Sequence, residues 1–416
     1  MDFKPIFDFN PIVMSIPIFF VLIGIELIVE RLSHKQLYRL PDAIANLSCG
    51  ITSQLSGVFL KIFAIGAYGF LFENFAIFTL ERSWWYWTLL ALLVDLSYYR
   101  AHRMSHEVNL FWGGHVVHHQ SEEYNLSVAL RQSSLQVIWT FGFSLPIAFL
   151  GFHTFDFALV AALNTLYQFW IHTETIGKLP RWIELIFNTP SHHRVHHGRD
   201  PKYIDKNHAG SLIIWDRMFG TFQEEEEKPT YGITKPINSW NAVWANMSHY
   251  ADMTYDLKRI PKWTDRVKYL FMKPGWMPEY LGGYRAAPPV DRRTYHKYDT
   301  PSPLSLNLYV LFQFAVCLAG TSLFLFNQAN FTIPQKAMIA TLVAIVVVNC
   351  GVLFEQRAWV KTAEFVRVIL YPAMLSGLTY WYQWSAALHL IAASYFLISF
   401  FWFFSLQRQH DRIQMA

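Results

Sequence analysis

Long apolar segments constrain the fold of this chain more than any other feature. Four of them follow one another near the end of the sequence, at about Leu304–Phe326, Met338–Phe354, Phe365–Tyr380 and Ala386–Phe404. Another covers about Pro11–Val29 and is close to the roughly 20 residues that an α-helix needs to cross a bilayer. Because a single segment satisfies its backbone in lipid by forming a helix, the pattern predicts an all-α, polytopic integral membrane protein.

Two pairs of apolar segments between these blocks predict helical hairpins. The first pair is about Leu55–Phe72 with Trp84–Tyr99, and the second is about Leu135–Gly151 with Phe155–His172. Basic residues cluster after the first span, beginning with Arg31, and mark its end as cytosolic. Each hairpin returns to the side from which it left. We therefore expect the sequence that follows each hairpin to lie on the cytosolic side.

Composition supports a membrane protein and excludes other classes. Hydrophobic residues make up 53% of the chain and charged residues 15%, where a soluble domain has about a quarter charged. The net charge of +4 is too small to indicate a nucleic acid partner. The three cysteines form no CxxC pair, and the chain contains no G-x-G dinucleotide fingerprint. Any reducing electrons must therefore come from an external reductant.

Changes in polarity along the chain predict four regions. We expect N-terminal membrane spans at residues 1–83, a catalytic core at 84–240, an interfacial or soluble cap segment at 241–303 and a C-terminal transmembrane bundle at 304–416. The cap segment interleaves basic residues with tryptophan and tyrosine, which suits contact with lipid headgroups. Within the core, the run Glu224–Glu227 predicts a solvated loop.

Three short histidine groups fall in the predicted core. The first has the spacing HxxxH, and the other two have the spacing HxxHH. On a helix each spacing places its imidazoles on one face, so we expect each group to bind a metal from one side. A single ion takes three or four such ligands, so eight imidazoles fit two ions. The expected ligands are His102, His106, His115, His118, His119, His193, His196 and His197.

Ligands that are all nitrogen leave iron, zinc, copper and nickel open. The setting at a membrane surface favours iron, since oxygen activation against unreactive C–H bonds needs redox chemistry that zinc lacks. The alternatives from other classes are a divalent-metal transporter, a metal-binding membrane protein without a redox role, and a zinc hydrolase. Transporter sites tend to lie at mid-membrane on broken helices, whereas these histidines lie at the ends of spans.

A polar stripe precedes the third histidine group. Asn164, Gln168 and His172 recur at intervals of four on an expected membrane helix, where polar side chains are usually functional. His172 is a candidate ninth ligand. A hydrogen bond between helices is the alternative role for its imidazole.

Two carboxylates beside the first histidine group are candidate catalytic residues. Asp95 lies two helical turns before His102, where it can accept a hydrogen bond from a ligand imidazole. An ion pair with Arg100 or Arg103 is the alternative. Glu107 directly follows His106 and can handle protons or hold a cofactor, or it is an interfacial carboxylate.

The three histidine groups resemble the motifs of the fatty acid hydroxylase and sterol desaturase superfamily, whose members are integral membrane di-iron enzymes. The segment Trp215–Phe222 is similar to the closing segment of that superfamily. A narrower resemblance, to ether-cleaving monooxygenases that act on alkylglycerols, rests on His102–Asn109, Tyr124–Ser133, Tyr167–Glu174 and Asn188–Gly198.

The resemblance implies a di-iron monooxygenase that uses O2 as co-substrate. Such an enzyme inserts one oxygen atom next to the ether oxygen of an alkylglycerol or lyso-ether lipid, and the product falls apart to a fatty aldehyde and a glycerol derivative. It also implies tetrahydrobiopterin as the electron donor, with Glu107 as the best residue to hold it. A fatty acid or sterol hydroxylase or desaturase is the alternative. The implied location is the endoplasmic reticulum membrane in a eukaryote or the inner membrane in a bacterium, with the site on the cytosolic side.

Overall fold

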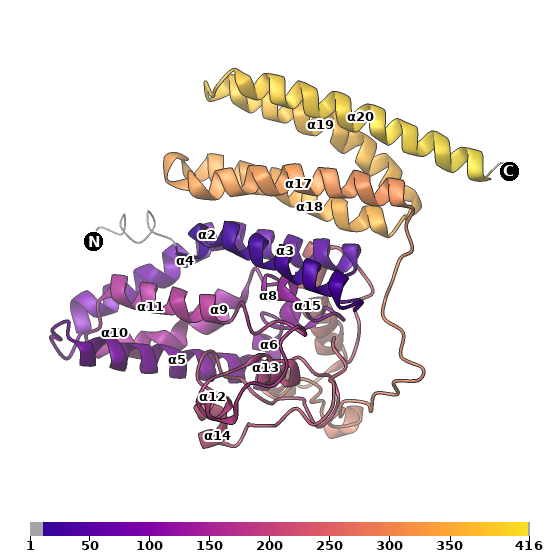
Figure 1. Cartoon of the computed structure of the whole chain (residues 1–416). Coiled ribbons are helices and arrows are strands. Elements are labelled where there is room, and N and C mark those ends of the chain that lie inside the picture. Colours follow the sequence, from indigo (N-terminus) through magenta and orange to yellow (C-terminus); the bar gives the residue numbers. More distant parts are fainter. Residues whose placement is uncertain (1–10, 415–416) are drawn as a thin grey trace. The chain divides into compact units, whose positions relative to one another are not determined.

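The computed structural model describes residues 11–414, whose regular secondary structure is helical, with two isolated β-bridges and no strand (Figure 1). The first ten and last two residues, which belong to the regions expected at 1–83 and 304–416, lie outside the described residues. The prediction of an all-α integral membrane protein is confirmed. Four described helices are long and apolar enough to cross a bilayer. They are α4 (Leu40–Phe75), α17 (Leu304–Phe326), α18 (Ile333–Phe354) and α20 (Ala387–Gln414), in which the candidate span is Ala387–Arg408.

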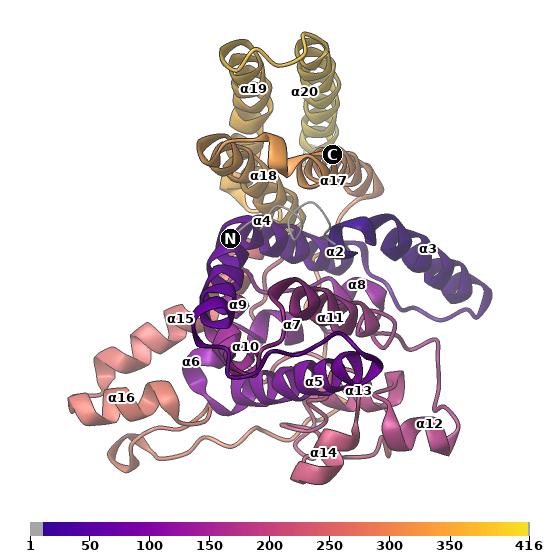
Figure 2. The same cartoon turned by 90° about the vertical axis from the view of Figure 1, so that its left-hand side faces the viewer.

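The chain divides into two compact units. One contains Met1–Asn238 and Val243–Tyr298, and the other contains Ser239–Ala242 and Asp299–Ala416. The second unit consists mainly of α17, α18, α19 (Ala358–Trp381) and α20. Figures 1 and 2 both show α19 and α20 side by side. Each of the four C-terminal apolar segments therefore lies within one helix.

A buried polar network joins the helices of the second unit. Arg367 of α19 forms an ion pair with Glu364, at 2.7 Å between Nη2 and Oε1. Tyr309 and Asn349, from α17 and α18, both donate to the Glu364 carboxylate. Arg367 also donates to Tyr395 of α20. Each partner is buried, so the charges are compensated within the helix bundle.

In the first unit, the helix of the first predicted hairpin begins earlier than its apolar segment. The N-terminal helices α2 (Pro11–Met14) and α3 (Ile16–Leu32) precede α4, which starts at Leu40 and not near position 55. The added turns contain Asp42 and Asn46, which are buried. Because these residues are polar, hydropathy alone did not predict that the turns are helical. The turns place polar side chains next to the histidine groups.

The second predicted hairpin is shorter than expected. Its first arm is broken into α9 (Gln136–Thr140), η1 (Phe141–Ser144) and α10 (Leu145–Phe149), and its second arm is α11 (Thr154–Tyr167). Both arms fall below the roughly 20 residues of a full span. Pro146 accounts for part of the break, because proline fits the first turn of a helix and disrupts its interior.

A hydrophobic core fixes the helix that carries the first histidine group. This helix, α5 (Trp84–Glu107), begins at the N-cap Ser83, which accepts a hydrogen bond from the backbone N–H of Tyr86 at 3.3 Å. Leu90 and Val94 of α5 pack with Tyr68 of α4 and Phe152. This packing sets the direction in which the last turns of α5 present His102 and His106.

The cap segment forms a helical hairpin of α15 (Ala242–Arg259) and α16 (Trp263–Phe271), which Figure 2 shows clearly. It has its own small core, in which Met253 and Ile260 pack with Tyr269. Trp263 is 73% exposed and Phe271 is 55% exposed. That this segment lies on lipid headgroups stays a prediction.

Candidate metal centre

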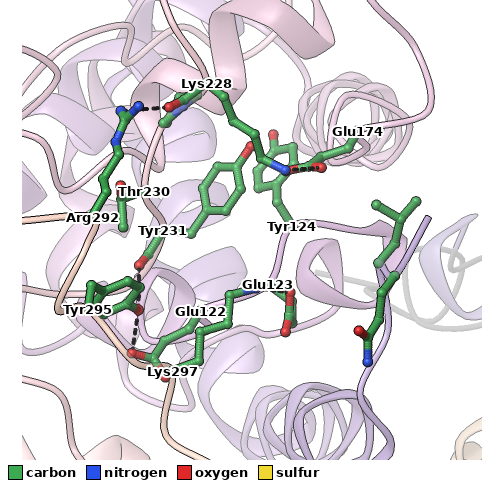
Figure 3. A pocket seen from close by; sticks show the side chains of 13 residues that line it. Glu122, Glu123, Tyr124, Glu174, Lys228, Thr230, Tyr231, Arg292, Tyr295 and Lys297 are labelled. Atoms are coloured by element: carbon green, nitrogen blue, oxygen red, sulfur yellow. Dashed lines mark hydrogen bonds and ion pairs between the residues drawn. The ribbon is translucent and has the colours of Figure 1, made fainter.

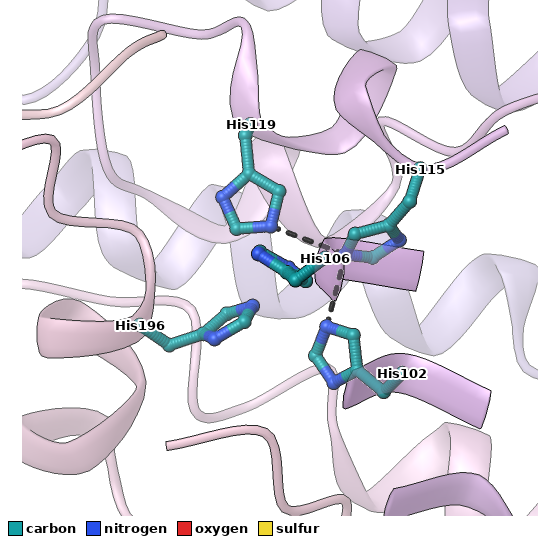
Figure 4. A group of neighbouring side chains, drawn as sticks. All are labelled: His102, His106, His115, His119 and His196. Carbon is teal, nitrogen blue, oxygen red and sulfur yellow. Dashed lines mark hydrogen bonds between the residues drawn. The ribbon is translucent and has the colours of Figure 1, made fainter. Parts of the chain in front are cut away.

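The histidine motifs converge into two groups of buried imidazoles. Within each group the candidate ligand atoms lie within 4.8 Å of one another. The five-histidine group, drawn in Figure 4, consists of His102, His106, His115, His119 and His196. The four-histidine group consists of His118, His172, His193 and His197.

Each HxxHH motif is divided between the two groups. His118 and His119 are adjacent in sequence, yet they belong to the four- and five-histidine groups respectively. His197 and His196 divide in the same way. Successive side chains on a helix point about 100° apart, so a histidine doublet faces two sides at once. The structure therefore corrects the expectation that each motif binds one metal from one side.

The imidazole nitrogens are spaced as metal ligands are. In the five-histidine group, Nε2 of His115 lies 2.9 Å from Nε2 of His102 and 3.1 Å from that of His119. In the other group, Nε2 of His172 lies 2.9 Å from that of His193. Metal–nitrogen bonds of about 2.0–2.1 Å place neighbouring ligand atoms about 3.0–3.4 Å apart.

Other imidazole nitrogens in the two groups lack partners. The Nε2 atoms of His106, His196 and His197 are buried and make no hydrogen bond to any other residue that the structure describes. A buried polar atom without a partner is costly, and a bound metal ion would satisfy these nitrogens. The described residues therefore fit two metal ions.

Several of the imidazoles, such as those of His118, His119 and His193, are held in the neutral form that binds metals. Burial lowers the pKa of His118 to about 4. Burial also lowers the pKa of His119 and of His193 well below the usual histidine value, and neighbouring histidines add to the effect. A neutral imidazole keeps a lone pair for the metal, so the folded site needs to lose few protons when it binds ions.

One short loop, residues 205–208, orients three ligands of the five-histidine group. His102 Nδ1 donates to the backbone oxygen of His208 at 2.8 Å. His196 Nδ1 donates to the backbone oxygen of Lys206 at 2.9 Å. The carboxylate of Asp205 lies 3.6 Å from His106 Nδ1. Each contact engages Nδ1 and turns Nε2 toward the metal position.

The 205–208 loop is anchored by the side chain of Asn207, a residue whose backbone is in an unusual conformation. Asn207 has φ of 55°, in the left-handed region that asparagine tolerates better than most residues. Its amide donates to the backbone oxygens of His192 at 3.0 Å and Gln223 at 2.7 Å, and its own oxygen accepts from Gln223 N–H. Asp216 then accepts from the backbone N–H of His208 at 2.8 Å. These bonds give the predicted closing segment a role in holding the loop.

Backbone oxygens orient the four-histidine group as well. His118 Nδ1 donates to the backbone oxygen of Arg131 at 2.9 Å, and His172 Nδ1 donates to that of Gln168 at 2.7 Å. The buried Arg131 guanidinium donates to Asn46 of α4 at 3.0 Å. The early turns of α4 therefore support the second histidine motif.

Asp95 has a different partner from the one expected. Its carboxylate is buried and accepts hydrogen bonds from the backbone N–H groups of Ser211 and Leu212 and from Trp215 Nε1, at 2.8–3.0 Å. The acceptor for the His102 imidazole is the backbone of His208. Asp95 therefore holds the segment that follows the 205–208 loop.

Glu107 forms an ion pair with Arg103 at 3.1 Å, and Lys273 Nζ lies 4.0 Å from the same carboxylate oxygen.

The run Glu224–Glu227 differs in part from the expected solvated loop. Glu225 is largely buried and binds the Arg194 guanidinium through two hydrogen bonds of 2.7 Å. Arg194 lies inside the third histidine motif, which explains why a glutamate of this run faces inward.

His208 is a functional candidate that the sequence did not reveal. Its ring is buried, and neither ring nitrogen has a hydrogen-bond partner among the residues 11–414. The ring centroid lies 5.0 Å from that of His106 and 5.5 Å from that of His196. Because it is a lone histidine, no spacing rule linked it to the motifs. Arg131 and Asn207 were also missed, although Arg131 lies within Tyr124–Ser133, a segment on which the family resemblance rests.

Comparisons with known proteins agree with this geometry. The model of the fatty acid hydroxylase family matches residues 87–221. Alkylglycerol monooxygenase from Homo sapiens is 38% identical over 85% of this chain and 80% of its own length. Its counterpart from Caenorhabditis elegans is 30% identical over 82% of this chain and 72% of its own length.

More distant matches cover less of the chain. Ornithine lipid hydroxylase OlsE from Rhizobium tropici is 26% identical over 32% of this chain and 40% of its own length. No solved structure matches the chain. The share of the chain and of the relatives that is covered shows the family, and the histidine groups with this family indicate non-heme iron. The chain belongs to the alkylglycerol monooxygenase family and is an oxygen-dependent monooxygenase built on a fatty acid hydroxylase core.

Proposed function

We propose that this enzyme cleaves the O-alkyl ether bond of alkylglycerols and lyso-ether lipids. One oxygen atom of O2 is inserted at the carbon next to the ether oxygen, and the resulting hemiacetal falls apart to a fatty aldehyde and a glycerol derivative. The observation that carries this proposal is the pair of buried imidazole groups in a chain that is 38% identical to an alkylglycerol monooxygenase over most of its length.

The residues of the chain supply what such a reaction needs. Two iron ions would be held by the five- and four-histidine groups and would supply the oxygen-activating chemistry. All nine histidines are buried, which limits the access of water to the reacting centre. The apolar faces of α3 and α4 offer the lipid a route from the bilayer, since side chains such as Ile25, Ile28 and Phe63 are exposed.

The reductant that we propose is tetrahydrobiopterin. Each turnover inserts one oxygen atom into the lipid and reduces the other to water, which requires two electrons and two protons from the donor. The chain has neither a dinucleotide fingerprint nor a CxxC pair, which supports a small diffusible donor. Glu107, in its ion pair with Arg103, stays our candidate for proton handling at the end of α5.

We place the histidine groups on the cytosolic side, because the basic residues Arg31, in the last turn of α3, and Lys35, just after that helix, lie at its C-terminal end. The membrane would be the endoplasmic reticulum in a eukaryote and the inner membrane in a bacterium. Modification of an engineered cysteine in the 205–208 loop by a reagent that cannot cross membranes tests the side. Labelling from the opposite side of intact vesicles would contradict this placement.

The substrate is tested with purified, iron-loaded enzyme. Iron is loaded anaerobically, and O2, tetrahydrobiopterin and an alkylglycerol are then added. We expect fatty aldehyde and glycerol in equal amounts. Free fatty acids and sterols serve as alternative substrates. Failure to form aldehyde with two irons bound, or faster hydroxylation of a fatty acid or sterol, would refute the ether-lipid assignment.

A further inference from the structure

A polar cleft lies next to the four-histidine group, because Tyr124, which lines it, contacts His172 and His197. One cavity of about 250 Å³ and another of about 520 Å³ share the lining residues Glu174, Lys228 and Tyr231. Figure 3 shows the first cavity, with the Tyr231 ring between the Glu174–Lys228 ion pair and Tyr295. Together the cavities are within the size range of sites for small organic ligands.

The cleft contains a buried group that lacks a partner. The Tyr231 hydroxyl makes no hydrogen bond to another described residue, although Tyr231 is only 5% exposed. Carboxylates lie toward the two ends of the Tyr231 side chain, with Glu174 toward the hydroxyl and Glu122 toward the backbone (Figure 3). Glu174 accepts from Lys228 at 2.7 Å, and Glu122 accepts from Tyr295 at 2.6 Å. Because a carboxylate accepts up to about four hydrogen bonds, both retain capacity for a ligand's N–H groups.

One aromatic side chain connects the cleft to the metal ligands. The Tyr124 ring stacks on Tyr231, with ring centroids 4.9 Å apart and planes inclined by 18°. Tyr124 also contacts two of the histidines. The centroid of its ring lies 5.8 Å from that of His172 and 5.2 Å from that of His197. Its hydroxyl donates to the backbone oxygen of Ile171, the residue before His172.

This arrangement separates two kinds of occupant. A lipid whose carbon is to be oxidised must place that carbon against the metal position, and the buried Tyr124 ring stands between the cleft and the ligands. An electron donor needs no such contact, since electrons cross an aromatic ring. Adjacent carboxylates and stacked tyrosines suit a flat heterocycle with several N–H donors.

We infer that this cleft binds the reductant, a reduced pterin, beside Tyr231, with Glu174 and Glu122 accepting hydrogen bonds from its N–H groups and Tyr124 linking it to the four-histidine group. The inference rests on the proposed function for the identity of the donor. In each turnover the tetrahydropterin gives up two electrons and two protons and is oxidised to a dihydropterin. One oxygen atom of O2 enters the lipid, and the other leaves as water. Glu107 is not among the residues that line the cleft.

The test uses full-length, iron-loaded enzyme and two conservative variants, Tyr231→Phe and Glu174→Gln. Loss of one hydrogen bond weakens binding by about three- to tenfold. We therefore expect each variant to raise the KM for tetrahydrobiopterin by that factor, and to leave the KM for the alkylglycerol and the iron content within twofold of wild type. Tyr68→Phe, which removes a buried hydroxyl bonded to the Phe152 backbone far along α4, is the matched control and should change neither KM.

A binding measurement separates this inference from the proposed function. Oxidised biopterin is fluorescent, and its binding to the iron-free full chain is followed by quenching. We expect weaker binding in both variants than in wild type and in Tyr68→Phe. Equal binding by all four proteins would overturn the cleft assignment. A rise in the KM for the alkylglycerol alone would also overturn it, and would indicate that the cleft binds the lipid headgroup. A wild-type enzyme that neither binds biopterin nor uses the reduced form would instead refute the proposed reductant, and this inference with it.

Discussion

Replacement of Asn207 by alanine should remove metal selectively from the five-histidine group. The side chain takes part in three hydrogen bonds, two to the backbone oxygens of His192 and Gln223 and one from Gln223 N–H. Each is worth about 1 kcal/mol, and the left-handed backbone at φ of 55° costs alanine roughly 1 kcal/mol more. The loop therefore loses about 4 kcal/mol of local stabilisation.

That loss falls on three ligands at once. The 205–208 loop orients His102, His106 and His196, and loss of such outer contacts weakens metal binding by about 10- to 100-fold. The four-histidine group is oriented by Gln168 and Arg131 and keeps its contacts. We expect the variant to release one of its two irons to a chelator much faster than wild type does, and the other at the wild-type rate.

Iron per chain, measured by elemental analysis at intervals after chelator is added, provides the assay. Asn207→Gly is the matched control, because glycine loses the same hydrogen bonds and tolerates the left-handed backbone. It should release the first iron about fivefold more slowly than Asn207→Ala, which corresponds to roughly 1 kcal/mol. Retention of both irons at the wild-type rate, or equally fast loss of both, would show that the loop does not support one group specifically.

Three further predictions follow from the site. His119→Ala should weaken iron binding in the five-histidine group, and His118→Ala should weaken it in the four-histidine group. Each variant should therefore retain one tightly bound iron and form no aldehyde. Two tightly bound irons in either variant would contradict the division of the doublet between the groups. Arg194→Met should leave the buried Glu225 carboxylate unpaired and destabilise the fold by about 3–5 kcal/mol, with partial recovery in Arg194→Met/Glu225→Gln; a single variant as thermally stable as wild type would count against this. Burial lowers the pKa of His118 from its unfolded value near 6.5 to about 4, so below pH 6.5 the unfolded chain takes up a proton that the folded chain refuses until about pH 4. The metal-free protein should therefore lose about 3 kcal/mol from this residue as pH falls through that window, visible as a lower thermal midpoint, and a midpoint independent of pH would contradict the neutral imidazole.

That the eight motif histidines would lie close together was predictable because spacing carries the information. A run such as His193 to His197 places several imidazoles near one another whatever the distant parts of the chain do. Their division into two groups was not predictable from spacing, because it depends on how short helices such as α13 (Pro190–His196) are rotated by tertiary packing. His208 reaches the site through a left-handed turn at Asn207, which leaves no periodic signal.

The fold shows the same limit. Apolar length predicted helices such as α17 almost to the residue, since hydropathy alone decides a segment that faces lipid on most sides. The start of α4 was missed because Asp42 and Asn46 are polar and buried, and their partners lie far away in sequence, as with Ser121 and Arg131. Hydrogen bonds that satisfy buried polar groups are set by the whole fold and are invisible to a local pattern.

The divided doublets have a consequence for how the enzyme responds to its membrane. Consecutive Cα atoms are fixed about 3.8 Å apart by covalent geometry, and His118–His119 and His196–His197 each give one imidazole to each group. The separation of two bound ions is therefore constrained twice by a single peptide link, in addition to the packing of the helices that carry the other histidines. Changes in bilayer thickness or lateral pressure can tilt the helices around the centre while the two ions move together as a rigid body.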